Sequence, residues 1–365
     1  MREYLQRAVA LAILILGFCQ GAGAGGLTVL HHFTGTNGDG GLPTGGVVIS
    51  GSVLCGTTTS GGGSANTGTV FSINLDGSGF TNLHLFTGPD GAIPAGSLVA
   101  GGDMIYGTTS QGGAGGEGTV FALNQDGSGF AVLHGFSGVD GSDPIGGLCL
   151  AGGTLYGTTS GGFGNLGSGS VFGVNTDGTG FSTIYGFGPW EEGAWMAYAT
   201  VADPLGTVVI SGDILYGTTF EGPLLSNGAG FEVPGTVFSI NTDGSGFDYV
   251  CEVPALGGSG PHAGIVVAGE TLDGTTFGGD GWGGTVFAVN TDGTGFRVLH
   301  TFAGFDGACP VAALVLSGNT LYGTTTLGGG ANLGTVFSVN VDGTDFNILH
   351  SLSGLDGQSS RGAMV

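Results

Sequence analysis

The three tryptophans of the chain lie in two short segments that also carry carboxylates. The segment GPWEEGAW holds Trp190, Glu191, Glu192 and Trp195, and the segment GGDGWGG holds Asp280 and Trp282. Aromatic rings stack on the apolar face of a pyranose, and carboxylates accept hydrogen bonds from its hydroxyl groups. These six residues are therefore the candidate ligand-binding set, with a glycan or a cell-surface partner as the expected ligand. The alternative is that the rings only pack the interior of enlarged loops.

The same carboxylates raise the question of catalysis. Glycoside hydrolysis needs one protonated and one ionised carboxyl group at a defined separation. Glu191 and Glu192 are adjacent, and nothing in the sequence places a partner opposite either one. The chain also has no Ser-His-Asp order, phosphate loop or nucleophile elbow. We therefore assign no catalytic residue and expect a non-enzymatic binding protein. A structural or adhesive surface module without a small ligand and a polysaccharide-cleaving enzyme are the alternatives.

Histidine and aspartate recur at fixed places and are the candidates for a metal site. His31, His84, His134, His300 and His350 hold the second position of an LHxF phrase, and one Asp recurs in each N-x-D-G-[ST]-G phrase. A calcium loop needs several oxygen ligands, whereas Asp-Gly already explains a tight hairpin. We expect the His side chains to make local hydrogen bonds and the Asp side chains to build turns. No metal and no cofactor is predicted, with calcium as the open alternative.

These residues recur because the whole chain is a tandem repeat. The triplet GTT begins at Gly56, Gly107, Gly157, Gly217, Gly274 and Gly323, a period of about 50 residues. The last unit contains four β-type runs, at 313–317, 320–326, 334–340 and 346–352, separated by Gly-rich or Asp-Gly turns. Four antiparallel strands in each of six units predict an all-β fold, a β-propeller of about six blades with seven as the alternative. A β-solenoid is the rival fold, although its coils are usually shorter.

The loops of such a propeller divide between two faces. The Asp-Gly hairpins vary little, whereas the blade-to-blade connections and the loops between second and third strands vary in length. The two enlarged segments are 188–204 and 221–234, and the candidate residues lie in the first of them and in the loop around Trp282. We therefore expect the binding site on the variable face of a single domain spanning residues 25–365. Residues 27–33 look like a fourth strand and the end of the chain looks like a first strand, so the terminal segments complete the ring or begin a seventh blade.

Composition and the N-terminus limit the partners and the location. The 365-residue chain has no lysine, only four arginines and a net charge of -23, which argues against nucleic acid as a partner. Residues 1–24 carry two Arg, an apolar run and a small-residue cleavage site, and they predict a signal peptide cleaved after Ala24. The mature chain has no second apolar run long enough for a transmembrane segment, so a secreted or extracellular protein is expected.

The repeat also resembles a known family. The phrases LYGTTSGG at 155–162, GTVFSINTDGSGF at 235–247 and LHTF at 299–302 look like the bacterial tandem repeat called GloVer. The resemblance covers nearly all of residues 27–361 and implies a secreted or surface-displayed protein, with surface-sorting signals of several kinds at the C-termini of its members. It supplies no catalytic motif. A weaker similarity links the Asp-Gly turn and the strand after it to TolB-type propellers.

Overall fold

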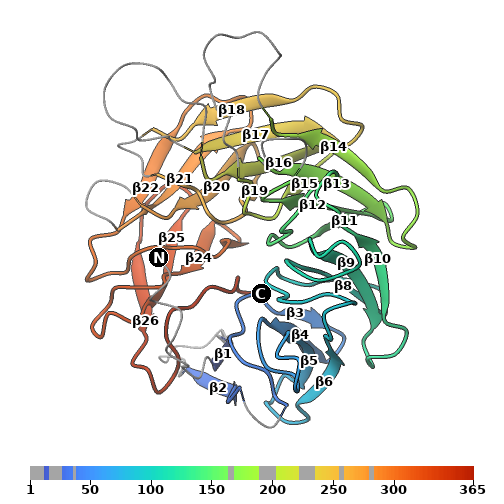
Figure 1. Cartoon of the computed structure of the whole chain (residues 1–365). Coiled ribbons are helices and arrows are strands. Elements are labelled where there is room, and N and C mark those ends of the chain that lie inside the picture. Colours follow the sequence, from blue (N-terminus) through green and yellow to red (C-terminus); the bar gives the residue numbers. More distant parts are fainter. Residues whose placement is uncertain are drawn as a thin grey trace.

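The fold is a ring of antiparallel sheets (Figure 1). A computed structural model describes residues 12–15, 27–35, 38–162, 168–188, 203–221, 235–254, 259–278 and 283–365. Six four-stranded sheets follow one another around the ring, and each sheet uses four strands that are consecutive in the sequence. The described residues contain strands and no helix. The prediction of a β-propeller is therefore confirmed with six four-stranded blades, and the β-solenoid alternative is wrong.

Each blade begins with a three-residue inner strand and ends with a five-residue outer strand. The first three blades are β3 (Val48–Ser50), β4 (Val53–Thr58), β5 (Thr69–Asn74) and β6 (Thr81–Leu85); β7 (Val99–Gly101), β8 (Met104–Thr109), β9 (Thr119–Asn124) and β10 (Ala131–Gly135); and β11 (Cys149–Ala151), β12 (Thr154–Thr159), β13 (Ser170–Asn175) and β14 (Ser182–Gly186). The last three are β15 (Val209–Ser211), β16 (Ile214–Thr219), β17 (Thr236–Asn241) and β18 (Asp248–Glu252); β19 (Val266–Ala268), β20 (Thr271–Thr276), β21 (Thr285–Asn290) and β22 (Arg297–Thr301); and β23 (Val315–Ser317), β24 (Thr320–Thr324), β25 (Thr335–Asn340) and β26 (Asn347–Ser351).

The hairpin between third and fourth strands is built by its Asp-Gly pair. In the first blade, Asp76 Oδ1 accepts hydrogen bonds from the backbone N–H of Ser78 at 2.9 Å and from its hydroxyl group at 2.6 Å. Gly77 takes a φ of +83°, which a side chain would strain. The carboxylate is thus used by the turn itself, and the same pattern recurs in every blade. This confirms the prediction that these aspartates build turns.

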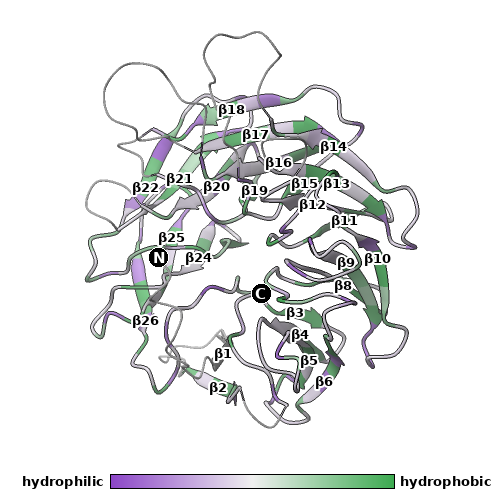
Figure 2. Cartoon of the chain, in the orientation of Figure 1, coloured by the Kyte–Doolittle hydropathy of each residue, from purple (hydrophilic) through white to green (hydrophobic). Residues whose placement is uncertain are grey.

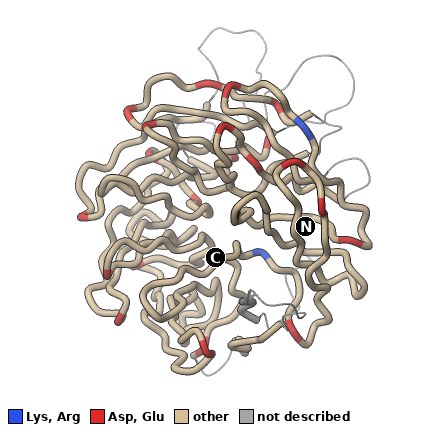
Figure 3. The backbone as a smooth tube through the Cα atoms, turned by 180° about the vertical axis from the view of Figure 1, so that it is seen from behind, with Lys and Arg blue, Asp and Glu red and all other residues tan. Residues whose placement is uncertain are grey.

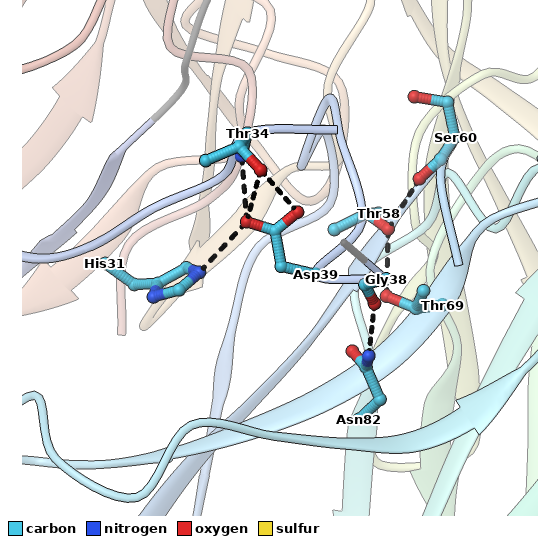
Figure 4. Close-up of polar contacts among 8 residues, drawn as sticks. All are labelled: His31, Thr34, Gly38, Asp39, Thr58, Ser60, Thr69 and Asn82. Carbon is cyan, nitrogen blue, oxygen red and sulfur yellow. Dashed lines mark hydrogen bonds and ion pairs between the residues drawn. The ribbon is translucent and has the colours of Figure 1, made fainter. Parts of the chain in front are cut away.

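The recurring Gly-Thr-Thr solves two packing problems. Gly56 lies opposite Phe71 in the ladder of the first blade, and a Cβ on Gly56 would stand 2.5 Å from Phe71 Cζ. The glycine therefore makes room for an aromatic ring of its own blade. The second threonine of the triplet, Thr58, shares a buried 2.9 Å hydrogen bond with the Thr69 hydroxyl group (Figure 4). This pair joins strands two and three of the blade.

The hydrophobic core lies between neighbouring blades. Phe121, Ile105 and Leu123 of the second blade are fully buried against residues of the first blade that include Val70 and Phe86. Equivalent clusters follow around the ring, and Figure 2 shows the apolar residues concentrated on the strands. Because each cluster is shared by two blades, no blade can bury its apolar faces alone.

The terminal segments lie between the sixth and the first blade (Figure 1). Gly46 contacts Ala363 so closely that a Cβ on Gly46 would stand 2.8 Å from the Ala363 carbonyl oxygen. His31 of β2 (Thr28–His32) and Phe33, which follows β2, pack against Phe80 of the first blade. β2 also pairs with β1 (Ala12–Ile15) in the same register, including the β-bulge, that β6 keeps with β5. β1 lies within the predicted signal peptide, so β2 and residues 361–363 are the terminal segments that a mature chain would keep beside the first blade.

Candidate functional site

The six residues predicted to form the ligand-binding set lie outside the described residues. These are Trp190, Glu191, Glu192, Trp195, Asp280 and Trp282. The structure does describe the ends of the segments that carry them. Gly188 follows β14, Asp203 precedes β15, and the stretch around Trp282 begins after Gly278 and ends before Gly283. Their prediction as a ligand-binding set stays a prediction, and the structure places only the ends of the segments that carry them.

The strand registers define the face of the ring at which these ends lie. In the first blade, Thr58 at the end of the second strand lies opposite Thr69 at the start of the third, and Leu85 at the end of the fourth strand lies opposite Thr69 as well. The same end of the blade also carries the start of the first strand, and the other blades share this arrangement. Every blade-to-blade connection and every loop between second and third strands therefore starts and finishes at this end, called the connection face below. In five blades the two kinds of segment are also bridged to each other, as Gly41 is to Ser60. The described ends of the segments that carry the candidate residues, at Gly188, Asp203, Gly278 and Gly283, lie at the connection face.

A cavity of about 370 Å³ lies in the centre of the ring at the connection face. It is lined by seven similar short segments, at 44–45, 95–97, 145–147, 205–207, 262–264, 311–313 and 361–363. Six of them precede the first strand of a blade, and the seventh lies near the C-terminus. Hydrogen bonds join these segments around the ring: Thr108 Oγ1 donates to the Gly146 carbonyl oxygen and Thr158 Oγ1 donates to that of Gly206, each at 3.0 Å. The first threonine of the Gly-Thr-Thr triplet thus joins one blade to the next at Thr108, Thr158 and Thr218, whereas the hydroxyl groups of Thr57, Thr275 and Thr324 have no hydrogen-bond partner in the described chain.

One position in each of these seven segments differs in chemistry from blade to blade. It usually follows a proline and precedes a Gly or Ala, and we call its seven occupants the channel ring: Thr44, Ala95, Ile145, Leu205, His262, Val311 and Arg361. All seven line the cavity. Sequence reasoning missed this set, although a single variable position between a constant proline and small residues was the signal that could have found it.

His262 and Arg361 are the titratable residues among those that line the cavity. Burial lowers the pKa of His262, and the positive charge of Arg361 lowers it further. At neutral pH the imidazole is therefore uncharged and Arg361 supplies the positive charge. Figure 3 shows acidic residues spread around the ring, whereas a basic segment lies beside the C-terminus near its centre. The cavity is thus a positively charged place on a strongly negative protein.

The repeated histidines have a structural role at the outer rim. His84 Nε2 lies 2.9 Å from Asp90 Oδ2, and the same spacing of six residues joins His134 to Asp140 at 2.8 Å and His350 to Asp356 at 2.6 Å. His300 pairs with Asp306 in the same way, and His31 lies 3.8 Å from Asp39 (Figure 4). The predicted local hydrogen bond is confirmed. Its partner, the Asp of the next connection, was recognisable in the sequence from the constant H-x₅-D spacing.

Four of these rings, those of His31, His84, His134 and His300, also stack on a phenylalanine of the blade that follows. The His84 ring stacks on Phe130 with centroids 3.6 Å apart, and the His134 ring stacks on Phe181 at 3.5 Å. Burial would raise the pKa of Asp356, but hydrogen bonds from the Ser353 N–H, His350 and the Ser353 hydroxyl group outweigh it and lower the pKa to about 2. The His–Asp–Phe contacts therefore hold neighbouring blades together. In the part of the chain that the structure describes, no group of three or more His, Cys, Asp or Glu could hold a metal ion.

Two carboxylates near the connection face have perturbed acidity. Burial raises the pKa of Asp143, and the neighbouring Glu117 raises it further; Asp203 is raised by burial and by Glu221 in the same way. Each Asp immediately precedes the proline of its channel segment. A carboxyl group with a raised pKa can donate a proton or bind a hydroxyl group. The sequence showed neither pair, because their members are separated by more than a strand.

Cys55, Cys149 and Cys251 are free thiols, and Cys55 and Cys309 are buried. Burial raises the pKa of Cys55 and of Cys251 to about 11, which makes these thiols poor nucleophiles. Among the described residues, the structure contains no helix with the length and apolar character needed to span a membrane.

The repeat pattern and the ring together agree with a family comparison. The model of the Gloeobacter/Verrucomicrobia repeat family matches residues 20–231 and 196–365. The chain belongs to this family. A search of curated proteins found no match. The family assignment confirms the resemblance seen in the quoted phrases.

Several solved structures are similar to this member of the repeat family in fold. A chain of the nidogen/laminin complex is similar with a TM-score of 0.50 and 14% identity, over 81% of this chain and 94% of that chain. The tricorn protease gives a TM-score of 0.48 and 14% identity over 86% of this chain and 27% of its own. TolB from Acinetobacter baumannii gives 0.43 and 11% over 76% of this chain and 58% of its own. At these identities only the fold of the first carries over.

Proposed function

We propose that this protein is an exported, non-enzymatic propeller that binds a glycan through its connection face. The observation that carries the proposal is the coincidence of two features at one end of the ring. The central cavity of about 370 Å³ lies there, and the described ends of the segments that carry Trp190, Trp195 and Trp282 lie there as well.

The uniformity of the other face supports the same choice. Its Asp-Gly hairpins repeat one hydrogen-bond pattern in all six blades, which is what a scaffold requires. The connection face instead combines conserved fastening contacts, such as Thr108 to Gly146, with segments of different length and composition. Binding residues are commonly held on variable loops above a rigid framework.

The N-terminal sequence and the composition support export. Residues 1–24 have the charge, the apolar run and the small residues of a signal peptide, and the described fold is built without lysine. Stabilisation by interlocking blades, buried threonine pairs and His–Asp contacts needs no cofactor. A surface-displayed or secreted binding protein fits these properties.

Tryptophan fluorescence of the purified protein tests the proposal, because the described ends of the segments that carry all three tryptophans lie at the connection face. We expect a saturable change with at least one polysaccharide of a panel of neutral and acidic glycans. Alanine at Trp190, Trp195 and Trp282 together should abolish binding, measured by calorimetry, and leave the β-sheet circular dichroism unchanged. The matched control is Leu75→Ala, which removes an exposed apolar side chain from the hairpin face.

Unchanged affinity in the triple variant would refute the tryptophan face. If no glycan binds the folded protein, the structural or adhesive surface module replaces this proposal. Release of reducing ends from a bound polysaccharide would instead establish the enzyme, with Glu191, Glu192 and Asp280 as the first residues to substitute.

A further inference from the structure

The channel ring is divided into a polar part and an apolar part. In ring order, Ala95, Ile145 and Leu205 are consecutive and apolar. His262, Arg361 and Thr44 occupy the other part, with Val311 between the histidine and the arginine. Seven equivalent positions around one cavity thus carry different side chains.

The polar part contains hydrogen-bonding capacity that the described protein leaves unused. Thr44 Oγ1 is buried and has no hydrogen-bond partner in the described chain. The equivalent segments do use their hydroxyl groups: Ser97 Oγ accepts from the Gly46 N–H and Thr207 Oγ1 accepts from the Gly147 N–H, each at 2.9 Å. A buried hydroxyl group without a partner costs free energy, and a ligand that bonds to it recovers that cost.

The charge of the site selects the ligand class. Arg361 offers one guanidinium group, which binds a carboxylate through two parallel hydrogen bonds. The protein as a whole carries a net charge of -23, so its field repels polyanions more strongly than a singly charged ligand. The uncharged His262 ring, the Thr44 hydroxyl group and the carbonyl groups of the channel segments suit hydroxyl groups. The apolar part suits the C–H face of a sugar ring.

We propose that the channel ring binds the carboxylate-bearing unit of an acidic sugar, a hexuronic acid residue, with Arg361 on its carboxylate and His262 and Thr44 on its hydroxyl groups. This inference rests on the proposed glycan binding and names the class of glycan. A cavity of about 370 Å³ is within the size range of sites for small molecules.

The test compares D-galacturonate, D-galactose and inorganic phosphate by calorimetry with the purified full chain. Galacturonate should bind, galactose should bind at least about tenfold more weakly, and phosphate should not compete. Arg361→Gln should weaken galacturonate binding by about 10- to 100-fold and leave the weak galactose binding unchanged. The matched control is Arg297→Gln, which removes the same charge from β22, where the guanidinium donates to the Val341 carbonyl oxygen.

A second readout follows His262 by proton NMR, with the resonance assigned from its loss in His262→Gln. Bound galacturonate should raise the pKa of His262, because a carboxylate beside the ring favours the imidazolium form. Arg361→Gln should raise the pKa in the free protein, because it removes the positive charge that lowers it. A structural role for Arg361 would not make the His262 pKa respond to galacturonate.

Equal affinity for galactose and galacturonate, equal losses in both arginine variants, or displacement by phosphate would overturn the inference. If a neutral polysaccharide binds through the tryptophans while galacturonate does not bind, the proposed function stands and only the channel site fails. If galacturonate binds with the tryptophan fluorescence unchanged by every polysaccharide, the channel site stands and the tryptophan face fails.

Discussion

The fifth blade carries a buried carboxylate where most other blades carry a tyrosine. Asp273 takes the place of Tyr106, Tyr156 and Tyr216 in the second strand and is fully buried. Its Oδ1 atom has no hydrogen-bond partner in the described chain, and its Oδ2 atom lies 3.5 Å from the Thr271 hydroxyl oxygen. Burial raises the pKa of Asp273 to about 6, although Arg297 and Thr271 both act in the opposite direction. The ionised carboxylate therefore destabilises the fold.

The magnitude follows from the two pKa values. The unfolded chain holds the carboxyl group near a pKa of 3.8, and the folded chain holds it near 6. Because the folded state binds the proton more tightly, its stability is greatest below pH 4 and falls as the pH rises to about 6. A difference of about two pKa units corresponds to about 3 kcal/mol, fully lost above pH 6.

Asp273→Asn removes this titration and nearly preserves the shape of the side chain. We expect the unfolding free energy of Asp273→Asn, relative to the native protein, to increase by about 3 kcal/mol between pH 4 and pH 7. Urea unfolding followed by circular dichroism at unit pH intervals measures it, and the difference between the two proteins cancels the titration of all other groups. Asp273→Tyr should be stabilised in the same direction.

Asp248→Asn is the matched control, because Asp248 is exposed at the start of β18. Asn at this exposed position should change the unfolding free energy at pH 7 by less than about 0.5 kcal/mol. If the difference between Asp273→Asn and the native protein stays constant between pH 4 and pH 7, the carboxylate is not desolvated as the structure indicates and the reasoning is refuted.

Three further predictions concern contacts within and between the blades. Gly107→Ala should lower stability by about 2 kcal/mol or more in thermal unfolding, because its Cβ would stand 2.6 Å from both Phe121 Cζ and Leu98 Cδ2, whereas Gly135→Ala meets nothing within 4 Å and should be neutral. Thr158→Val should lower the unfolding free energy measured in urea by about 1–3 kcal/mol, because the Gly206 carbonyl oxygen loses its donor. Thr57→Val, at a hydroxyl group without a partner in the described chain, should leave the unfolding free energy unchanged. Equal losses in the two variants would contradict the assigned role of Thr158. Asp356, with its pKa lowered to about 2, stabilises the fold above pH 4, and this contribution is lost as the pH falls toward 2. Asp356→Asn should therefore make the melting temperature depend less on pH in that interval. An unchanged pH dependence would contradict the stabilising role of the carboxylate.

Much of the fold could be predicted from the sequence because its signals are local. The Asp-Gly turn needs only Asp76, Gly77 and Ser78, and it recurs with the repeat. The four β-type runs of the last unit correspond to β23–β26 with differences of one or two residues at their ends. The role of glycine in Gly-Thr-Thr was only half predicted: which ring fills the space above Gly56 depends on the register with Phe71.

The candidate site was harder to predict for two different reasons. The tryptophan and carboxylate segments were chosen from composition, and they lie outside the described residues. The channel ring was missed, because its members are about 50 residues apart and each one alone looks like an ordinary residue after a turn. The inter-blade His–Phe stacks, such as His84 on Phe130, were missed for the same reason.

The sequence by itself determined the strands, the tight turns and the repeated blade, because hairpin geometry and apolar alternation act between residues close together in the chain. The tertiary structure decided how those blades meet. Only closure of the ring brings His262, Arg361 and Thr44 to one cavity and buries Asp273 between two blades. The physical reason is that burial and long-range proximity depend on packing between units, which the local pattern of any single unit does not contain.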